Sequence, residues 1–154
     1  MQVELLTQLE IPVLGFQESG VYDIHRARCT GAPLFRKQTS RNDCVWIQAG
    51  GDNIYAAHRG PLPARLIALC NIWSGYMQQD TLYRLAVVQF MSLVDSGRPS
   101  NVHGLVTVQL KDFTRELTIV DIGTILRLGH LILETDRRWR VNSRIDLHTF
   151  NEIY

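Results

Sequence analysis

The stretch LPARLIALCNIWSGYMQQDTLYRLAVVQFMSL, residues 62–93, decides the fold of this chain. It contains the two longest apolar runs, residues 62–73 and 82–93. The segment between them has a length that suits a hairpin loop. We therefore expect two long antiparallel strands at the centre of a sheet.

A helix over residues 82–94 is the alternative for the second run. Several of its apolar residues would share one helical face, as Leu82 and Leu85 do. The β-branched pair Val87 and Val88 is typical of strands, however, and so are the aromatic residues of the same run. These residue types favour the strand.

Short β-rich runs separated by turn clusters surround this hairpin. The turns contain Gly, Pro, Asn and Asp, which tolerate or impose the backbone angles that turns need. We expect strands over residues 11–16, 22–28, 45–49, 54–57, 62–73, 82–93, 105–110 and 116–120. Spacing of this kind is typical of all-β domains. The sequence thus predicts a mainly β fold, either a meander or a partly open small β-barrel.

Two helical segments are expected after the last of these strands. Asp121 can cap a short helical turn near 121–128, and Gly129 would end it. Asp146 begins a second pattern, in which apolar residues follow at helical spacing up to Tyr154. We predict a C-terminal helix there that docks its apolar stripe on the sheet.

The composition is that of an ordinary globular domain. The 154 residues are 45% hydrophobic and 20% charged, which excludes a disordered or fibrous chain. The sequence has no repeat, low-complexity tract or linker, so we predict one domain over residues 1–154. Its apolar runs fall short of the roughly 18–20 residues that cross a bilayer, and its N-terminus lacks a signal-peptide pattern. We expect no membrane partner.

The spacing of the three cysteines indicates whether the compartment of the protein is reducing or oxidising. Cys29, Cys44 and Cys70 are widely spaced and form no CxxC pair. Neither a disulfide framework nor a zinc site is therefore predicted. A reduced, intracellular compartment fits best, with the nucleus as the finer expectation.

The histidines are scattered singly along the chain. A general acid or base needs a partner within hydrogen-bond reach, and a ribonuclease-like pair of His25 with His58 or His103 is the conceivable arrangement. The turn at residues 95–100 lacks the lysine and the following helix of a phosphate loop. We predict no catalytic residue, no metal and no cofactor, and therefore no enzyme.

Among the sixteen basic residues only Lys37 and Lys111 are lysine. Arginine suits phosphate because its planar fork binds two oxygens at once. The candidate nucleic-acid-binding residues form two groups: Arg26, Arg28, Arg36, Lys37 and Arg41, then Arg137, Arg138, Arg140 and Arg144. If the chain binds DNA or RNA, the two groups should lie on one surface. A solvated face or a genomic arginine bias is the alternative.

Aromatic residues offer a second candidate site. Trp46, Tyr55 and Trp73 flank turns and are candidates for an aromatic cage that would bind a methylated ammonium. Packing in the core is the alternative. The apolar neighbours of Trp46 and Trp139 predict that both are buried.

Two stretches in the last two-thirds of the chain carry a family resemblance. The first consists of residues 41–47 and 59–66, and the second of residues 119–125, 129–132, Trp139, Val141, Asn142, Ile145 and Asp146. They resemble the C-terminal region of fungal transposable-element proteins of the Plavaka and Zisupton kind. Leu133 departs from that pattern, in which we expect a proline. The resemblance implies an accessory region, with the catalytic carboxylates of the transposase in another part of the protein.

The residues from Asp43 to Ile47, a glycine-rich turn and residues 63–69 are also similar to the opening strands of bromo-adjacent homology domains. Those are β-rich modules that often act in chromatin. We therefore expect a non-enzymatic interaction domain that binds nucleic acid or a chromatin protein. A structural or protein-binding module with no nucleic-acid role, as a monomer or a dimer, is the second interpretation, and a nuclease-type enzyme is the third.

Overall fold

The computed structural model of the chain describes residues 1–14, 22–30, 41–48, 61–76, 79–94, 107–110, 116–135 and 137–142. This part is built almost entirely from antiparallel strands, which confirms the predicted mainly β fold. The elements are β1 (Gln2–Leu6), β2 (Gln8–Leu14), β3 (Tyr22–Thr30), β4 (Arg41–Asn42), β5 (Cys44–Ile47), β6 (Leu62–Tyr76), β7 (Gln79–Leu93), β8 (Thr107–Leu110), β9 (Thr118–Asp121), the 3-10 turn η1 (Ile122–Thr124), β10 (Ile125–Gly129), β11 (Leu131–Thr135) and β12 (Arg138–Val141).

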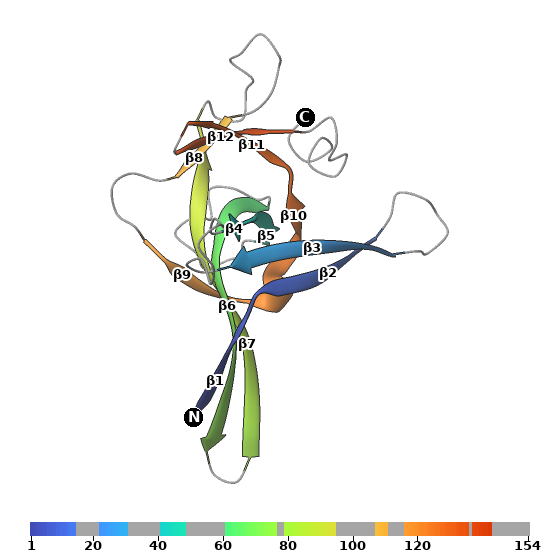
Figure 1. Cartoon of the computed structure of the whole chain (residues 1–154), viewed down its shortest axis with the longest axis vertical. Helices are drawn as coiled ribbons and strands as arrows, with labels where there is room; N and C mark the ends of the chain where they lie inside the picture. Colours follow the sequence, from blue (N-terminus) through green and yellow to red (C-terminus); the bar gives the residue numbers. More distant parts are fainter. Residues whose placement is uncertain are drawn as a thin grey trace, which may run out of the picture.

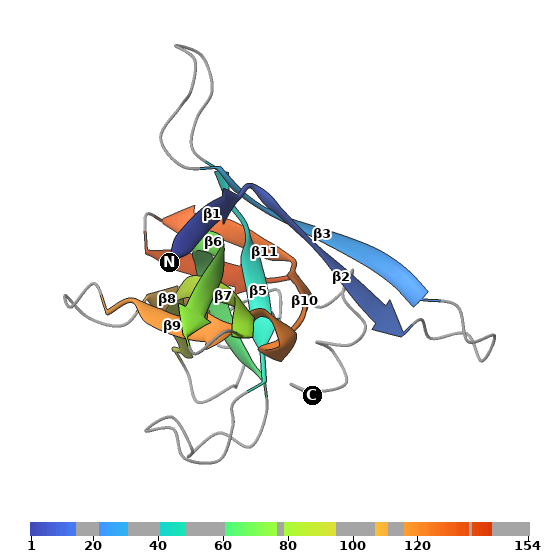
Figure 2. The same cartoon turned by 90° about the horizontal axis from the view of Figure 1, so that it is seen from below.

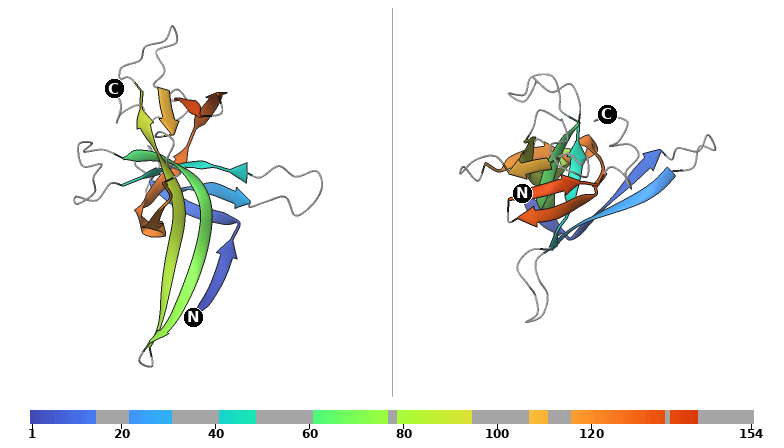
Figure 3. Two further views of the ribbon diagram at one scale, coloured as in Figure 1. Left: turned by 90° about the vertical axis from the view of Figure 1, so that its left-hand side faces the viewer. Right: turned by 90° about the horizontal axis from the view of Figure 1, so that it is seen from above.

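Strands β6 and β7 form one long antiparallel hairpin, as the sequence predicts. Its register joins Cys70 to Leu85, and an irregularity interrupts it between Leu66 and Ala68. β1 pairs with the other edge of β6 along the second half of that strand. The tip of the hairpin and β1 project together beyond the rest of the molecule (Figure 1). Figure 3 shows β1 running beside the curved hairpin from another side.

The large sheet has the strand order β10-β5-β6-β7-β8-β12-β11, with β1 and β9 added at the edges of β6 and β7. Its middle, from β5 to β8, is a meander of neighbours in sequence. The end strands β10 and β11 are consecutive in the chain and joined by His130 alone. They do not pair with each other, so the described strands form no closed barrel.

A second sheet of β2, β3 and β4 packs beside the first. Its two long strands form a ribbon that extends away from the large sheet (Figure 2). Backbone hydrogen bonds connect the ribbon to its surroundings, from Cys29 N to Thr7 O at 2.9 Å and from Asp43 N to Arg28 O at 3.0 Å. The inward side chains Ile11 and Ala27 join the core of the large sheet.

The core consists of two clusters of buried side chains. The larger one lies between the ribbon and the large sheet and includes Leu66, Leu69 and Val88. The smaller one gathers around Trp46 and Trp139, which are 3% and 8% exposed. The predicted burial of both tryptophans is thus confirmed.

The helical turn expected near 121–128 is wrong beyond its first residues. Asp121 does act as a cap, since its carboxylate accepts a hydrogen bond from Gly123 N at 2.7 Å, but η1 is a single 3-10 turn. From Ile125 the chain is strand β10, paired with β5. Its buried residues, Ile125 and Arg127, follow the strand period of two rather than a helical period.

Gly129 also has a different role from the predicted helix end. A Cβ atom there would lie 3.3 Å from the backbone C and O of Cys44, so the missing side chain lets β10 approach β5 closely. The sequence did not predict β1, β4, β11 or β12. The expected C-terminal helix and the expected strand over 54–57 lie outside the described residues.

Candidate functional site

The large sheet has an exposed side over β1, β6, β7 and β9. Residues opposite each other in paired strands point to the same side of a sheet. The registers of Val3 with Ile72 and of Ile72 with Tyr83 therefore place these three side chains together. We call this side the outer face. Its apolar residues are Val3, Leu5, Cys70, Ile72, Tyr83, Leu85, Val87 and Ile119, and the same register places Asp121 on this side, opposite Leu85.

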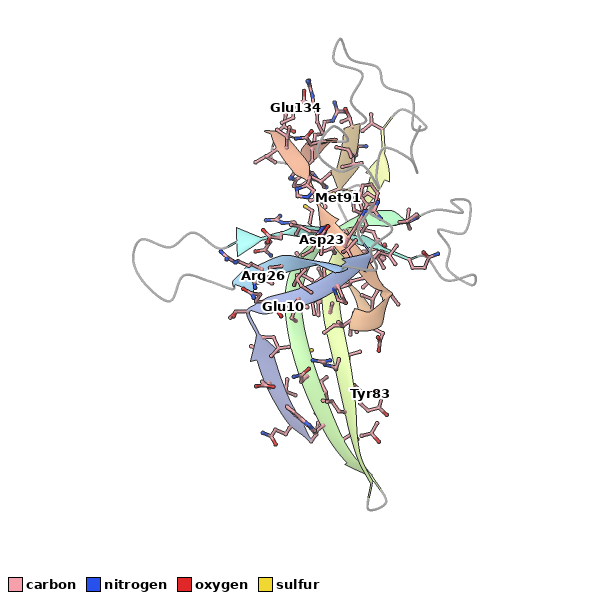
Figure 4. All side chains as sticks on the ribbon, turned by 90° about the vertical axis from the view of Figure 1, so that its right-hand side faces the viewer. Glu10, Asp23, Arg26, Tyr83, Met91 and Glu134 are labelled. Atoms are coloured by element: carbon pink, nitrogen blue, oxygen red, sulfur yellow. The ribbon has the colours of Figure 1, made fainter. Side chains whose placement is uncertain are left out.

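The outer face is mostly apolar although it faces solvent. Leu5 is 76% exposed and Ile119 65%, and Val3 and Tyr83 are about half exposed. Figure 4 shows Tyr83 on the projecting part of the sheet, away from the buried Met91. An antiparallel sheet with one face on the core normally presents polar residues on the other. This arrangement is typical of a surface that another molecule covers.

A pocket of about 360 Å³ lies where the large sheet ends. Its walls come from the start of β5, from the β10–β11 junction and from β12. The polar residues in these walls are Asn42, Asp43, His130 and Asn142, and Trp139 supplies an aromatic wall. The pocket therefore combines one carboxylate, two amides and two rings.

Backbone hydrogen bonds hold Asp43 in the pocket wall. Its Oδ2 accepts from Arg28 N at 2.8 Å, its own N–H donates to Arg28 O, and its carbonyl oxygen accepts from Leu66 N at 2.9 Å. These bonds connect β3, β6 and the segment between β4 and β5. One of them reaches the carboxylate, and the other two hold the backbone of Asp43 between β3 and β6.

His130 packs against a second histidine, His25 of β3. The ring centroids are 6.3 Å apart in an edge-to-face arrangement. Nδ1 of His25 accepts a hydrogen bond from Leu128 N at 3.3 Å, and His130 O accepts one from Asn142 N at 2.8 Å. The partners suggested from the sequence, His58 and His103, lie outside the described residues. Sequence reasoning missed this pair because 105 positions separate its members and no local pattern marks it.

The described arginines of the two candidate groups lie on β3, on β4 and around β12. Arg26 and Arg28 are exposed on β3, and Arg137 and Arg138 are exposed at the start of β12. Arg26 Nε pairs with Glu10 Oε1 at 3.0 Å, and Arg138 Nε donates to Gln109 Oε1 at 3.3 Å. Figure 4 shows Glu10 and Arg26 together on the ribbon of β2 and β3.

Arg140 pairs with Glu134 across the β11–β12 hairpin, and this hydrogen bond lowers the pKa of the Glu134 carboxyl. For Arg41 the structure describes the backbone in β4. Arg36, Lys37 and Arg144 lie outside the described residues. The positive charges of Arg26 and Arg140, two members of the predicted arginine groups, are thus balanced by neighbouring carboxylates.

One arginine that the sequence did not single out is buried. Arg127 of β10 is 4% exposed, and its guanidinium carbon lies 5.4 Å from the centroid of the Trp46 ring. A cation over an indole face is a favourable contact, more so away from water. A strand period of two over residues 125–129 would have indicated its inward direction.

Trp46 and Trp73 do not form the walls of one aromatic cage. Trp46 is buried and lies opposite Pro63, whereas Trp73 lies ten residues further along β6, on the projecting part. Ten residues of strand span about 33 Å. Tyr55, the third candidate, lies outside the described residues. Trp46 instead packs in the core, the alternative given above.

All three cysteines are free thiols. Burial raises the pKa of the Cys44 thiol to about 12, with Arg65 opposing and Asp43 adding to the shift. Burial, and then the nearby Asp43 charge, also raises the pKa of Cys29, whose Sγ donates to Ile67 O at 2.7 Å. These two thiols therefore stay protonated at neutral pH.

Comparisons of the chain with protein-family models, with curated proteins and with solved structures find no match. Within the described ranges no helix has the length and the hydrophobicity needed to span a membrane. No group of three or more potential metal ligands occurs among the described residues. The outer face and the pocket are therefore the features of the molecule from which a function can be inferred.

Proposed function

We propose that this chain is a non-enzymatic interaction domain that associates with a second copy of itself through the outer face. The observation that supports the proposal is a row of apolar side chains on β1, β7 and β9, each of which has about half or more of its surface exposed. Covering such side chains is favourable by about 25 cal/mol for each Å² removed from water.

A second copy is the partner that the chemistry of the face favours. Apart from Asp121 at its β9 end, the residues named on the outer face carry no charge, so a complementary surface should be mostly apolar as well. Two such sheet faces can pack about 10 Å apart, as the sheets of a β-sandwich do. A two-fold axis would bring identical patches together and close the assembly at a dimer.

Analytical ultracentrifugation of the whole chain tests this proposal. We expect a concentration-dependent dimer for the wild type. The double variant Leu5→Lys with Ile119→Lys should be monomeric, because it would place like charges in the contact. The matched control, Ile24→Lys with Leu133→Lys, changes side chains of similar exposure on other strands and should remain a dimer. A wild type that stays monomeric at high concentration, or a control that dissociates equally, would contradict the proposal.

Nucleic-acid binding is the second candidate function, and the place of the pocket supports it. Asn42, next to Arg41, and Trp139, between Arg138 and Arg140, both line the pocket. Segments from the two arginine groups therefore meet there. The resemblance to fungal transposon proteins and to bromo-adjacent homology domains points the same way, with a nuclear location and a chromatin partner as its further consequences.

The salt dependence of binding to unrelated DNA and RNA sequences tests the second candidate. Changing Arg28 and Arg138 to Gln should weaken binding to all sequences alike and lower the slope of log K against log salt by up to about two units. The same change at Arg26 and Arg140, which pair with carboxylates, should have a smaller effect. Absence of wild-type binding at low salt would exclude this function.

A further inference from the structure

Strand β11 has one edge that no other described strand pairs with. Along its opposite edge it pairs with β12, where Leu131 lies opposite Val141 and Leu133 opposite Trp139. β11 lies at the end of the molecule opposite the tip of the β6–β7 hairpin (Figure 1), so this open edge is separate from the projecting part of the outer face. We infer that the open edge binds an extended apolar segment of another protein, which adds to the large sheet as a further strand.

A hydrogen bond between β11 and β12 shows which backbone groups of β11 point to the open edge. Opposite residues of an antiparallel pair alternate between hydrogen-bonded and non-hydrogen-bonded positions. His130 O accepts from Asn142 N at 2.8 Å, and the register places these two residues opposite each other. Ile132, two residues further, therefore also turns its N–H and C=O toward β12. Leu131 and Leu133 turn theirs to the open edge.

A second hydrogen bond, on the other side of β12, gives the same direction. Leu110 N donates to Arg137 O at 3.1 Å, and the register of β8 with β12 places these two residues opposite each other. Two residues after Arg137, Trp139 therefore faces β8, and the next residue, Arg140, faces β11. Arg140 lies opposite Ile132, which the first hydrogen bond also turns toward β12.

The open edge begins where β5 leaves the bent strand formed by β10 and β11. Gly129 at the end of β10 pairs with Cys44, the first residue of β5. The chain before β5 does not continue along β11, because Asn42 of β4 pairs with Cys29 of β3 instead. Backbone groups of residues two apart point to the same edge, so those of Leu131 point to the side that β5 has left. An added strand would therefore lie in line with β5.

The side chains along the open edge favour an apolar partner. Edge strands of natural proteins commonly carry charged residues or proline, which discourage pairing with another chain. Leu131, Ile132 and Leu133 offer neither, and Ile132 and Leu133 are 49% and 61% exposed. Successive side chains of a strand point to opposite faces, so both faces present apolar contact to a neighbouring strand.

The spacing of the open backbone groups identifies the ligand as a polypeptide. Leu131 and Leu133 each offer one N–H and one C=O, and residues two apart in a strand repeat at roughly 6.8 Å. An extended segment presents donors and acceptors at the same repeat, which is how a peptide adds to a sheet edge. The pocket adjoins this edge, because Leu131 and Ile132 line it, and its volume of about 360 Å³ can take a side chain of the added strand.

Amide hydrogen exchange of the whole chain, followed by nuclear magnetic resonance, tests the inference. The probe is the peptide acetyl-Lys-Val-Ile-Val-Lys-amide. The matched control has a methyl group on the backbone nitrogens of its three central residues, so it keeps the charge and the side chains without those N–H donors. We expect saturating probe to slow exchange of the Leu131 and Leu133 amide protons by at least about tenfold and to leave that of Ile132 unchanged. The control peptide should slow neither.

A proline at the open edge tests the same contact from the side of the protein. Leu133→Pro removes an N–H that points away from β12, a position where a strand tolerates proline. It should weaken the probe by at least about fivefold, since one backbone hydrogen bond is lost and the ring obstructs the edge. Leu133→Val keeps the N–H and should bind within about twofold of the wild type. Near-ultraviolet circular dichroism checks the fold of both variants, and if Leu133→Pro does not fold, the exchange pattern of the wild type decides.

Several results would overturn the inference. Slow exchange of the Leu131 and Leu133 amides in the free protein at low concentration would show that the edge is already covered. Protection that rises with protein concentration without the probe would assign the edge to a second copy of the chain. Equal protection by the probe and the methylated control would show that side chains alone make the contact. Exchange that the probe leaves unchanged would show that the edge does not accept a strand.

Discussion

The two halves of the β6–β7 hairpin have similar sequences but different surroundings. Near its base, Leu66 lies opposite Val88 and both are fully buried under the ribbon of β2 and β3. Near its tip, Ile72 lies opposite Tyr83, and Tyr83 is about half exposed. Hydrophobic side chains thus serve folding at one end and are available for association at the other.

This difference shows that an apolar strand is not by itself evidence of a core. The buried half contributes its apolar area to the stability of the isolated chain. The exposed half can contribute the same kind of free energy when a second molecule covers it. Matched substitutions in the two halves therefore test which residues stabilise the fold.

The largest contrast is expected between two tryptophans. Trp46→Ala should lower the free energy of unfolding by about 3–5 kcal/mol, because it leaves a cavity and removes the ring beside the buried Arg127. Trp73→Ala, on the projecting half, should cost less than about half of that. Urea denaturation of both variants at low protein concentration measures the difference. Similar losses would show that the projecting half is part of the core.

A smaller contrast is expected between two leucines. Leu69 is buried on the inner side of β6, and Leu69→Ala should lower the free energy of unfolding by about 2–5 kcal/mol. Leu5 is exposed on the outer face, so Leu5→Ala should change the stability of the monomer by no more than about 0.5 kcal/mol. The same leucine substitution should instead weaken the proposed dimer. Denaturation at several protein concentrations separates these two effects, and a stability loss independent of concentration for Leu5→Ala would contradict the assignment.

The smallest expected effect is a pH dependence of the stability that arises from the buried residue Cys44. Burial raises the pKa of Cys44 to about 12 in the fold, from 9.0 for an ordinary thiol. The unfolded state therefore loses this proton first as the pH rises. The contribution of the Cys44 thiol to the free energy of unfolding is therefore complete below pH 9. It falls between pH 9 and pH 12 by about 1.4 kcal/mol for each pH unit.

Cys44→Ala removes this titration, so its stability should fall less steeply than that of the wild type above pH 9. Urea denaturation at pH 8 and pH 10 gives the free energy of unfolding of each protein at both pH values, and therefore its slope with pH. Cys70→Ala is the control, since Cys70 is only partly buried on the outer face. Parallel curves for wild type and Cys44→Ala would show that the buried thiol does not titrate as the structure implies.

Sequence patterns predicted the long elements better than the short ones. The β6–β7 hairpin was predictable because many β-branched and apolar residues all favour the same state. β11 and β12 have five and four residues, and each includes charged side chains. Their strand state depends on pairing with each other and with β8, which no local pattern encodes.

The candidate site was less predictable than the fold. The arginine groups were visible in the sequence, but the carboxylates that pair with Arg26 and Arg140 were not assigned to them. The pocket was not predicted, because its walls come from residues 42–44, 128–132, 139 and 142. Only the curl of the large sheet brings these segments together at His130.

The sequence by itself determined the mainly β class, the central hairpin and the burial of Trp46 and Trp139, because each depends on residue types that favour one local state. It did not determine which side of β7 faces the core. Apolar residues occupy both sides of that strand, Leu85 and Val87 on one and Ala86 and Val88 on the other. Packing of the β2–β3 ribbon buries the second pair and leaves the outer face exposed. That choice belongs to the tertiary structure, because a period of two separates the sides of a strand without saying which one another element will cover.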